Sequence, residues 1–158
     1  MNTTDADLRQ LLDRTEISDL VHRLGVCLDE GRFDEMRSLL IEEATARTPG
    51  GTAEGRDALI GQASRNHRPE QAIQHVVTNL LVDLDGDRAK VRANLVVYFG
   101  PPEGGPPAEG PGPVLPPPVD YTLGEVYHFD LVRTPDGWRF SRVRTDPVWR
   151  SGSPPPRR

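Results

Sequence analysis

Apolar residues in the first part of the chain follow the spacing of an α-helix. Thr4 opens a capping-box variant at the start of this pattern, and Gly31 ends it as a residue suited to the left-handed conformation. The apolar positions, which slip in phase near 13–15, are Leu8, Leu11, Leu12, Ile17, Leu20, Val21, Leu24 and Leu28. Two further helices are predicted over Asp34–Glu43 and Gly55–Asn66, with a short strand over Ala44–Thr48 between them.

The second half of the chain changes to the composition and period of β-strands. The expected strands, rich in β-branched and apolar residues, are Ala72–Leu84, Arg88–Phe99, Tyr121–Thr134 and Trp138–Trp149. Asp85-Gly86-Asp87 joins the first two as a strong hairpin signal, and Pro135-Asp136-Gly137 joins the last two. Three helices followed by four long antiparallel strands predict the α+β class, with the helices on one face of a curved sheet.

Proline and glycine gather in one segment of the chain. Of the 16 prolines, nine fall within Gly100–Val119. Proline cannot donate to a sheet ladder, and the segment has few apolar groups, so we predict a mobile insertion in a β-hairpin. A lid over a pocket and a PxxP ligand at 113–116 are the alternatives. One domain is therefore expected over 5–150, followed by a disordered tail at 151–158.

The charge balance and the single cysteine exclude several classes of protein. With 19 basic and 24 acidic residues the formal net charge is −5, unlike the basic domains that bind nucleic acid. No apolar stretch approaches the roughly 20 residues of a membrane span, and the N-terminus does not resemble a secretory signal. Cys27 alone cannot form an internal disulfide. We therefore expect a cytoplasmic protein without nucleic-acid or membrane partners.

Several short motifs follow one another in a fixed order between residues 8 and 150. They are Ile17-x-x-Leu20, Leu28-Asp29-x-Gly31-x-Phe33-Asp34, Gly55-Arg56-x-x-Leu59-Ile60, His75-Val76-x-x-Asn79, Leu131-Val132-Arg133-Thr134-x-x-Gly137-Trp138-Arg139-Phe140 and Arg144-x-x-Pro147-Val148-Trp149. Their order and spacing resemble SnoaL-like proteins of the nuclear transport factor 2-like superfamily. Relatives in that superfamily include scytalone dehydratase, ketosteroid isomerase, limonene epoxide hydrolase and the polyketide cyclase SnoaL. The resemblance implies a cone-shaped barrel, in which a bent antiparallel sheet surrounds a pocket closed by helices, and commonly a homodimer.

His75 and Asp29 are the candidate catalytic residues. Alternation places one set of side chains on the same strand face: Ile73, His75, Val77, Asn79 and Leu81. Taken alone, a histidine there is more often structural, but dehydratase-like members place a pocket histidine at the position of His75 and an aspartate at that of Asp29. Such a pair suits proton transfer, because the carboxylate fixes the imidazole tautomer and stabilises the imidazolium. His22, seven residues before Asp29 on the same helix face, is the alternative partner, and solvent exposure is its simpler interpretation.

The residues expected around the substrate are mainly apolar. They are Leu24, Leu28, Ile73, Val77, Asn79, Leu95, Tyr98, Tyr121, Glu125 and Tyr127, with Glu125 or a tyrosine hydroxyl as the group that polarises a carbonyl. Leu28 stands where dehydratase members have a tyrosine, and their second histidine and asparagine match apolar or unrelated residues around Val96 and Val126. His67, in a polar run, is expected to be exposed.

Two patterns with metal-binding character receive simpler interpretations. His128-Phe129-Asp130 matches the start of an iron facial triad, but two residues match easily by chance. Asp83, Asp85 and Asp87 lack the spacing of a calcium loop and are read as a hairpin turn. Neither a metal nor a cofactor is predicted.

The sequence thus leads to two functional hypotheses. The first is a cofactor-independent lyase, isomerase or cyclase that acts on a hydrophobic, carbonyl-bearing substrate, as in secondary metabolism. The second is a non-catalytic ligand-binding or dimerisation module, because one fold hosts many functions.

Overall fold

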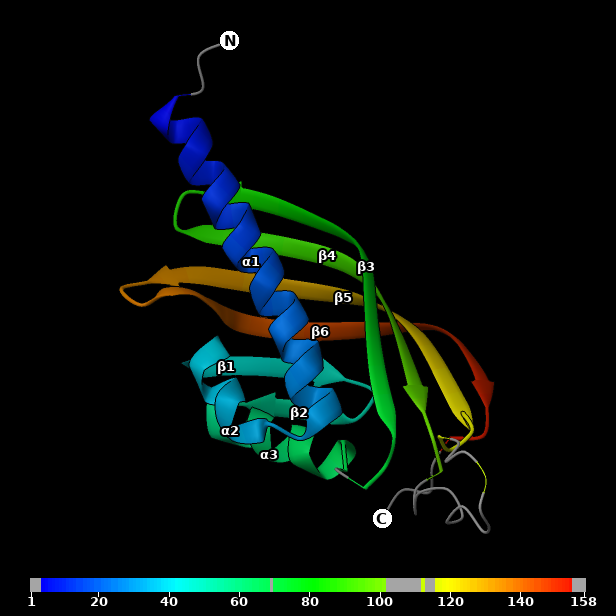
Figure 1. Ribbon diagram of the computed structural model, residues 1–158. Helices are drawn as coiled ribbons and strands as arrows, with labels where there is room; N and C mark the ends of the chain where they lie inside the picture. Colours follow the sequence, from blue (N-terminus) through cyan, green and yellow to red (C-terminus); the bar gives the residue numbers. More distant parts are fainter. Residues whose placement is uncertain (1–3, 69, 102–111, 113–115, 155–158) are drawn as a thin grey trace.

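A computed structural model describes residues 4–68, 70–101, 112 and 116–154 (Figure 1). Its helices are α1 (Asp5–Glu30), α2 (Phe33–Met36) and α3 (Arg56–Asn66), with a 3-10 turn at Arg37–Leu39. Its strands are β1 (Leu40–Thr48), β2 (Gly51–Glu54), β3 (Ile73–Asp85), β4 (Arg88–Phe99), β5 (Tyr121–Thr134) and β6 (Gly137–Gly152). No helix among these residues is long and apolar enough to cross a membrane.

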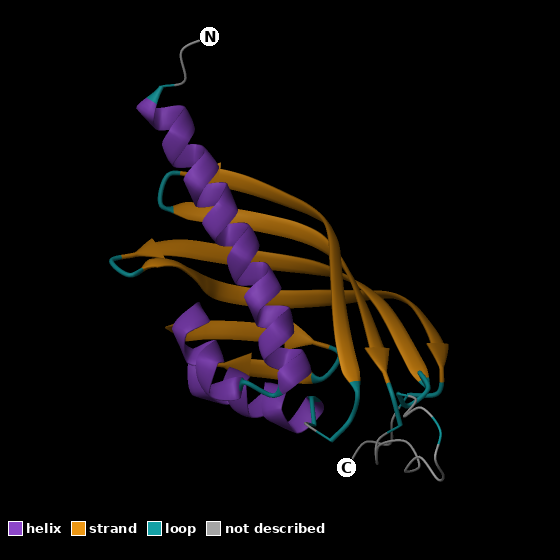
Figure 2. Cartoon of the chain, in the orientation of Figure 1, coloured by secondary structure: helices purple, strands orange, loops and turns teal. Residues whose placement is uncertain are grey.

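The six strands form one curved, open sheet in the order β2-β1-β6-β5-β4-β3. All neighbouring pairs are antiparallel except β1 and β6, which run parallel. Helix α1 crosses one face of this sheet, and α2 and α3 lie beside its β1–β2 end (Figure 2). This architecture confirms the predicted α+β cone, with a sheet that does not close into a full barrel.

Local sequence signals explain where α1 begins and ends. The Thr4 hydroxyl accepts the Asp7 N–H at 3.2 Å and Asp7 accepts the Thr4 N–H at 3.1 Å, which completes the predicted capping box. Gly31 adopts a φ of 66°, the left-handed conformation that ends the helix. The phase slip does not interrupt α1; its first turns extend past the sheet and leave Leu8, Leu11 and Leu12 exposed.

Asp13, at the phase slip, fixes α1 to the β5–β6 hairpin. The residue is 8% exposed, and its carboxylate accepts two hydrogen bonds from Arg133, both of 2.8 Å, and one of 3.0 Å from Trp138 Nε1. The Arg133 guanidinium also lies 4.6 Å from the centroid of the Trp138 ring. Glu16, one turn later, accepts the Trp138 N–H at 2.8 Å. Trp138 itself is fully buried, so this contact joins the helix directly to the core.

One predicted element is wrong in its extent, and one strand was not predicted. The helix predicted over Asp34–Glu43 stops at Leu39, and the chain continues as β1 because residues from Leu40 onward pair with β6. Strand β2 was not predicted, since four residues of Gly-Thr-Ala-Glu carry no periodic signal; it pairs with β1 across the turn at 49–50. The long strands lie within a few residues of their predicted bounds, and Gly86 and Gly137 adopt positive φ in the two predicted hairpin turns.

The predicted insertion at Gly100–Val119 lies mostly outside the described residues, which omit 102–111 and 113–115. At its base, the Asp120 N–H donates to Phe99 O at 2.8 Å and Phe99 pairs with Tyr121. The predicted tail begins within the last residues of β6, and its positions 155–158 also lie outside the described residues.

Candidate active site

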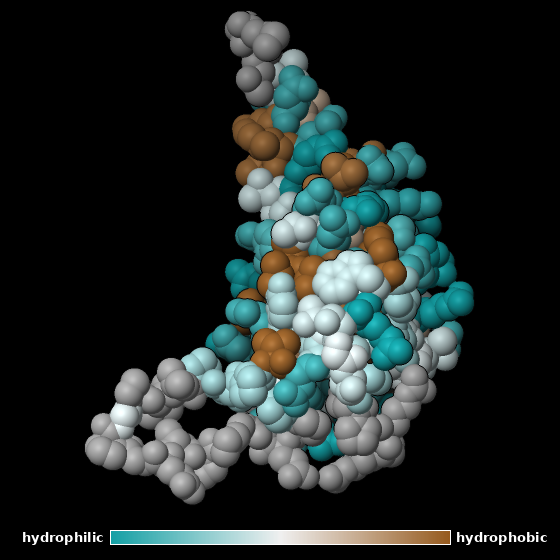
Figure 3. Space-filling view, turned by 90° about the vertical axis from the view of Figure 1, so that its right-hand side faces the viewer, coloured by the Kyte–Doolittle hydropathy of each residue, from teal (hydrophilic) through white to brown (hydrophobic). Residues whose placement is uncertain are grey.

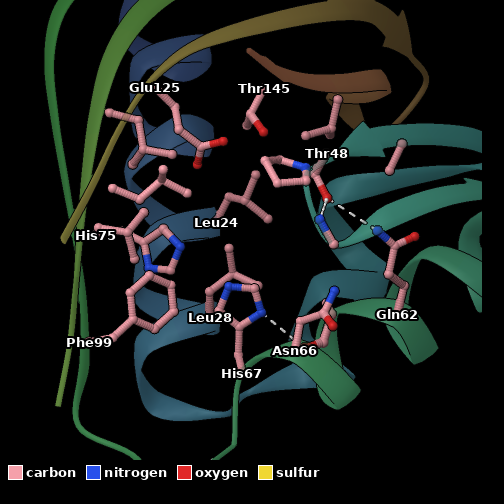
Figure 4. Close-up of a pocket in the computed structure, with 18 of the residues that line it drawn as sticks. Leu24, Leu28, Thr48, Gln62, Asn66, His67, His75, Phe99, Glu125 and Thr145 are labelled. Carbon is pink, nitrogen blue, oxygen red and sulfur yellow. Dashed lines mark hydrogen bonds between the residues drawn. The ribbon is translucent and has the colours of Figure 1, made fainter. Parts of the chain in front are cut away.

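A cavity of about 670 Å³ lies between the C-terminal half of α1, helix α3 and the concave side of the sheet (Figure 4). This volume falls within the range of small-molecule sites. Its apolar walls include Leu24, Leu28, Met36, Leu59, Leu95, Val97, Phe99, Leu123 and Val143. Its polar lining includes Thr48, Gln62, Asn66, His67, His75, Glu125 and Thr145. The site is therefore an apolar chamber with a few polar groups on its walls.

His75 and Asp29 meet at one wall of this chamber. The His75 side chain is only 3% exposed, and its Nδ1 lies 2.5 Å from Asp29 Oδ1. The same carboxylate accepts the backbone N–H of His75, at 2.9 Å to Oδ1 and 3.1 Å to Oδ2. Because a carboxylate only accepts hydrogen bonds, Nδ1 carries the proton and Nε2 of the neutral ring keeps its lone pair. Asp29 thus sets both the position and the tautomer of His75.

The elements that carry this pair come from distant parts of the sequence. Asp29 lies in the last turn of α1, two residues before the Gly31 cap, where the helix meets β3. His75 lies near the start of β3, which is an edge strand of the sheet. His22, the alternative partner of Asp29, is exposed to solvent.

Glu125 and Thr145 enter the cavity from neighbouring strands and form a second polar group there (Figure 4). Each residue is 7% exposed, and within the described chain Glu125 Oε1 and Thr145 Oγ1 are buried without a hydrogen-bond partner. Burial raises the pKa of the Glu125 carboxyl, which favours its neutral form. Burial also raises the pKa of the Tyr127 hydroxyl and keeps it protonated.

His67 lies in the cavity wall, whereas the sequence analysis placed it in solvent. It follows the last turn of α3, where its Nδ1 lies 3.0 Å from Ala63 O and its ring centroid 5.2 Å from that of His75. Desolvation of the buried ring, together with the nearby His75, lowers the pKa of His67 to about 4. The polar neighbours Arg65, Asn66 and Arg68 had suggested exposure, and the sequence has no signal for the turn that directs this ring inward.

Most of the predicted substrate-binding residues line the cavity: Leu24, Leu28, Leu95, Tyr121, Glu125 and Tyr127. Ile73 is buried in the core outside the cavity lining, and Val77 packs against that core. Asn79 and Tyr98 are exposed, so their placement in the pocket was wrong. A β-bulge between Thr78 and Leu81, with Asn79 at a φ of 52°, breaks the alternation along β3. Tyr98 alternates with the cavity-lining Val97 and Phe99 and therefore faces the other side of β4.

Thr145 and His67 line the cavity although neither was predicted to do so. Thr145 could have been found, because alternation along β6 places it on the same face as Val143. In the His128-Phe129-Asp130 motif, Nε2 of His128 lies 3.3 Å from Oδ2 of Asp146. No cluster of three or more metal-ligating side chains occurs among the described residues.

Comparisons with known proteins agree with this architecture. The family model of the SnoaL-like domain matches residues 9–144. Three solved structures share the fold: a protein from Kribbella flavida (24% identity, TM-score 0.73, covering 90% of this chain and 95% of that one), a candidate scytalone dehydratase from Novosphingobium aromaticivorans (18%, 0.72, 98% and 94%) and a type 2 hexachlorocyclohexane dehydrochlorinase, LinA (18%, 0.74, 95% and 98%). No curated protein matches the sequence. The chain therefore belongs to the SnoaL-like domain family and has the nuclear transport factor 2-like fold.

Proposed function

We propose that this protein is an enzyme that moves a proton at a carbon next to the carbonyl group of a hydrophobic small molecule. The observation that carries the proposal is the 2.5 Å contact between His75 and Asp29 at the wall of a largely apolar cavity. His75 acts as the general base and then the general acid, and Asp29 positions it. A lyase, an isomerase and a cyclase of the aldol type all use such a step.

The bonding of His75 supports its role as the base. Its Nδ1–H is held by Asp29, so Nε2 is the ring nitrogen available to take a proton from the substrate. The carboxylate then stabilises the imidazolium that forms. The side chain is almost fully buried, which removes the competition of bulk water for the same nitrogen.

Glu125 is the proposed partner for the substrate carbonyl. Proton removal places negative charge on the carbonyl oxygen, which a hydrogen-bond donor stabilises. Burial favours the neutral acid, whose O–H can donate, and the unpartnered Thr145 hydroxyl lies in the same part of the cavity. The names of two similar structures, a dehydrochlorinase and a candidate dehydratase, denote the elimination of hydrogen chloride and of water, reactions that include the loss of a proton.

Deuterium exchange tests the proposal without knowledge of the product. A panel of aromatic and polycyclic ketones is incubated with the protein in D₂O, and exchange at the carbon beside the carbonyl is followed by NMR. We expect at least one ketone to exchange, and His75→Ala to reduce its rate by about 10²–10⁴-fold. His22→Ala, which removes an exposed histidine, serves as the matched control and should leave the rate unchanged.

Binding measurements on the same panel separate the two functional hypotheses. If ketones bind but no hydrogen exchanges, the non-catalytic ligand-binding module replaces the enzyme. If exchange occurs equally in wild type and His75→Ala, His75 is not the base.

A further inference from the structure

We propose that His67 is a substrate-binding residue that accepts a hydrogen bond from a hydroxyl group, so that the preferred ligand is a hydroxy ketone. The inference rests on the proposed function for the ketone and on the position and bonding of His67 for the hydroxyl. Residue 67 belongs to neither the Asp29–His75 pair nor the Glu125–Thr145 group.

The end of α3 fixes the orientation of the His67 ring. The backbone N–H of His67 donates to Ala63 O at 2.9 Å, and the ring Nδ1 lies 3.0 Å from the same oxygen. The side chain therefore adds a second hydrogen bond to a carbonyl that already accepts the last helical one. This contact uses only Nδ1, and Nε2 has no hydrogen-bond partner among the residues that the structure describes.

The partner of Nδ1 also determines whether Nε2 donates or accepts a hydrogen bond. A carbonyl oxygen has no proton to give, so Nδ1 is the protonated nitrogen of the neutral ring and Nε2 carries the lone pair. The low pKa of His67, about 4, keeps the ring neutral at neutral pH. His67 is therefore an acceptor in the cavity, and the group that complements it is an O–H or N–H donor.

The neighbours of the ring indicate which ligand would bring that donor. In Figure 4 the second nitrogen of His67 points toward the side on which His75 and Phe99 lie. The 5.2 Å between the two imidazole centroids places a group bound to His67 close to the carbon that His75 would deprotonate. In the proposed function Glu125 and Thr145 bind the carbonyl oxygen of the ligand. A ligand that also carries a hydroxyl group near the deprotonated carbon would then contact His67 as well.

Matched ligands with and without the hydroxyl test this assignment. The probes are 1-tetralone and its monohydroxy regioisomers, with dissociation constants measured by calorimetry or fluorescence. In the wild type we expect at least one regioisomer to bind about 3- to 10-fold more tightly than 1-tetralone, the range of one net hydrogen bond. His67→Phe should bring that ratio to within about twofold, while His67→Gln, which keeps an acceptor, should restore part of it.

Two controls keep this result distinct from that for the base. His22→Phe should retain the full hydroxyl preference, and His75→Ala should retain it too while its exchange rate falls by about 10²–10⁴-fold. A hydroxyl preference without exchange in the wild type would contradict the proposed function but support the role of His67.

Absence of the preference in the wild type, or its persistence in folded His67→Phe, would overturn the assignment. If His67→Phe does not fold, the tautomer of His67 in the wild type tests the assignment instead. Long-range ¹H–¹⁵N correlations show which ring nitrogen carries the proton. A proton on Nε2 would make His67 a donor and refute the proposal.

Discussion

At the scale of single residues, the Asp29 carboxylate makes two kinds of contact with His75. It accepts the imidazole Nδ1–H and also the backbone N–H of the same residue. A side chain held through both its ring and its backbone has little freedom to turn, so the geometry of the base is set before a ligand arrives. Such preorganisation is what proton transfer requires.

Asp29→Asn should impair proton transfer while largely preserving the shape of the site. The amide oxygen can still accept the His75 N–H, but the amide NH₂ would then face Nδ1 and donate to it. The ring proton would move to Nε2, and His75 could no longer act as a base. We expect a loss of about 10²–10⁴-fold in the ketone exchange rate, with the tautomer change visible by ¹⁵N NMR. An unchanged rate with a changed tautomer would argue against His75 as the base.

His67 should make the stability of the protein depend on pH. Its pKa is about 4 in the folded state, below the ordinary value of 6.5, so between these values the unfolded chain binds more protons than the folded one. The free energy of unfolding should therefore fall as the pH is lowered from about 6.5 to about 4, and level off for this group below that.

Urea unfolding of wild type and His67→Phe across this range isolates the effect. The difference in stability between the two proteins should shrink or reverse steadily as the pH falls, because only the wild type carries this cost. Carboxylates that titrate in the same range are present in both proteins and cancel in the comparison. A difference that does not vary with pH would show that His67 titrates normally.

At the scale of elements, α1 carries both a structural contact and the candidate site. Asp13 holds the middle of the helix against the β5–β6 hairpin, and Asp29 holds its C-terminal end against β3. Between them the helix buries the apolar residues Ile17, Leu20, Val21, Leu24 and Leu28. The helix thus connects the β5–β6 hairpin in the middle of the sheet to the edge strand β3.

Asp13→Ala should destabilise the domain strongly. The substitution removes the acceptor for Arg133 and for the buried Trp138 Nε1, and we expect a loss of about 2–4 kcal/mol in urea or thermal unfolding. Asp87→Ala is the matched control, because Asp87 binds the same arginine but is 81% exposed. It should cost less than about 1 kcal/mol. Equal effects of the two substitutions would show that burial of Asp13 contributes nothing.

Prediction from sequence succeeded where the signal is local or repeated. The capping box, the two hairpin turns and strands β4 and β5 each depend on residues close together in the chain. The Asp29–His75 contact was predicted from the family resemblance, since 46 residues separate the partners.

The failures have long-range causes. Leu40 is in a strand rather than the predicted helix because it pairs with β6. Asn79 does not face the pocket because a β-bulge changes which side of β3 its side chain lies on. Burial of Asp13 depends on Arg133, 120 residues away. The exception is local, since the inward turn of His67 depends on the backbone carbonyl of Ala63, four residues earlier at the helix end. None of these contacts produces a period or a motif in the sequence.

At the scale of the whole molecule, the ends of the hairpin that holds the predicted insertion are already paired. Phe99 and Tyr121 are register partners whose rings lie 5.5 Å apart. Replacement of 102–117 by a short Gly/Asn turn should therefore change the melting temperature by less than about 4 °C, the shift that corresponds to roughly 1 kcal/mol. A larger drop, together with tighter ligand binding in the intact chain, would favour the alternative in which the insertion covers the pocket.

We also predict a homodimer formed through the outer face of the sheet. That face carries charged groups, including the His128–Asp146–Arg144 contacts, and the half-exposed Trp149 ring that covers Gly124. Sedimentation at micromolar concentration should show twice the 17.5 kDa of the single chain. Trp149→Glu should shift the equilibrium toward monomer.

A single species of 17.5 kDa in the wild type would refute the dimer. A dimer that persists in Trp149→Glu would favour an interface at the projecting N-terminal end of α1 instead. There Leu8, Leu11 and Leu12 form an apolar patch, visible near the top of Figure 3.

The contact between Asp29 and the backbone of His75 has one further consequence. Strand β3 is the last in the sheet, and the N–H of an edge strand invites pairing with a strand from another molecule. Asp29 occupies that N–H, so the carboxylate that we propose to position the base also blocks strand pairing at this point of the edge. Solubility and the proposed catalysis would therefore depend on the same atoms. A relative without the proposed reaction would still need the aspartate at this edge, so its presence in a sequence alone is not proof of activity.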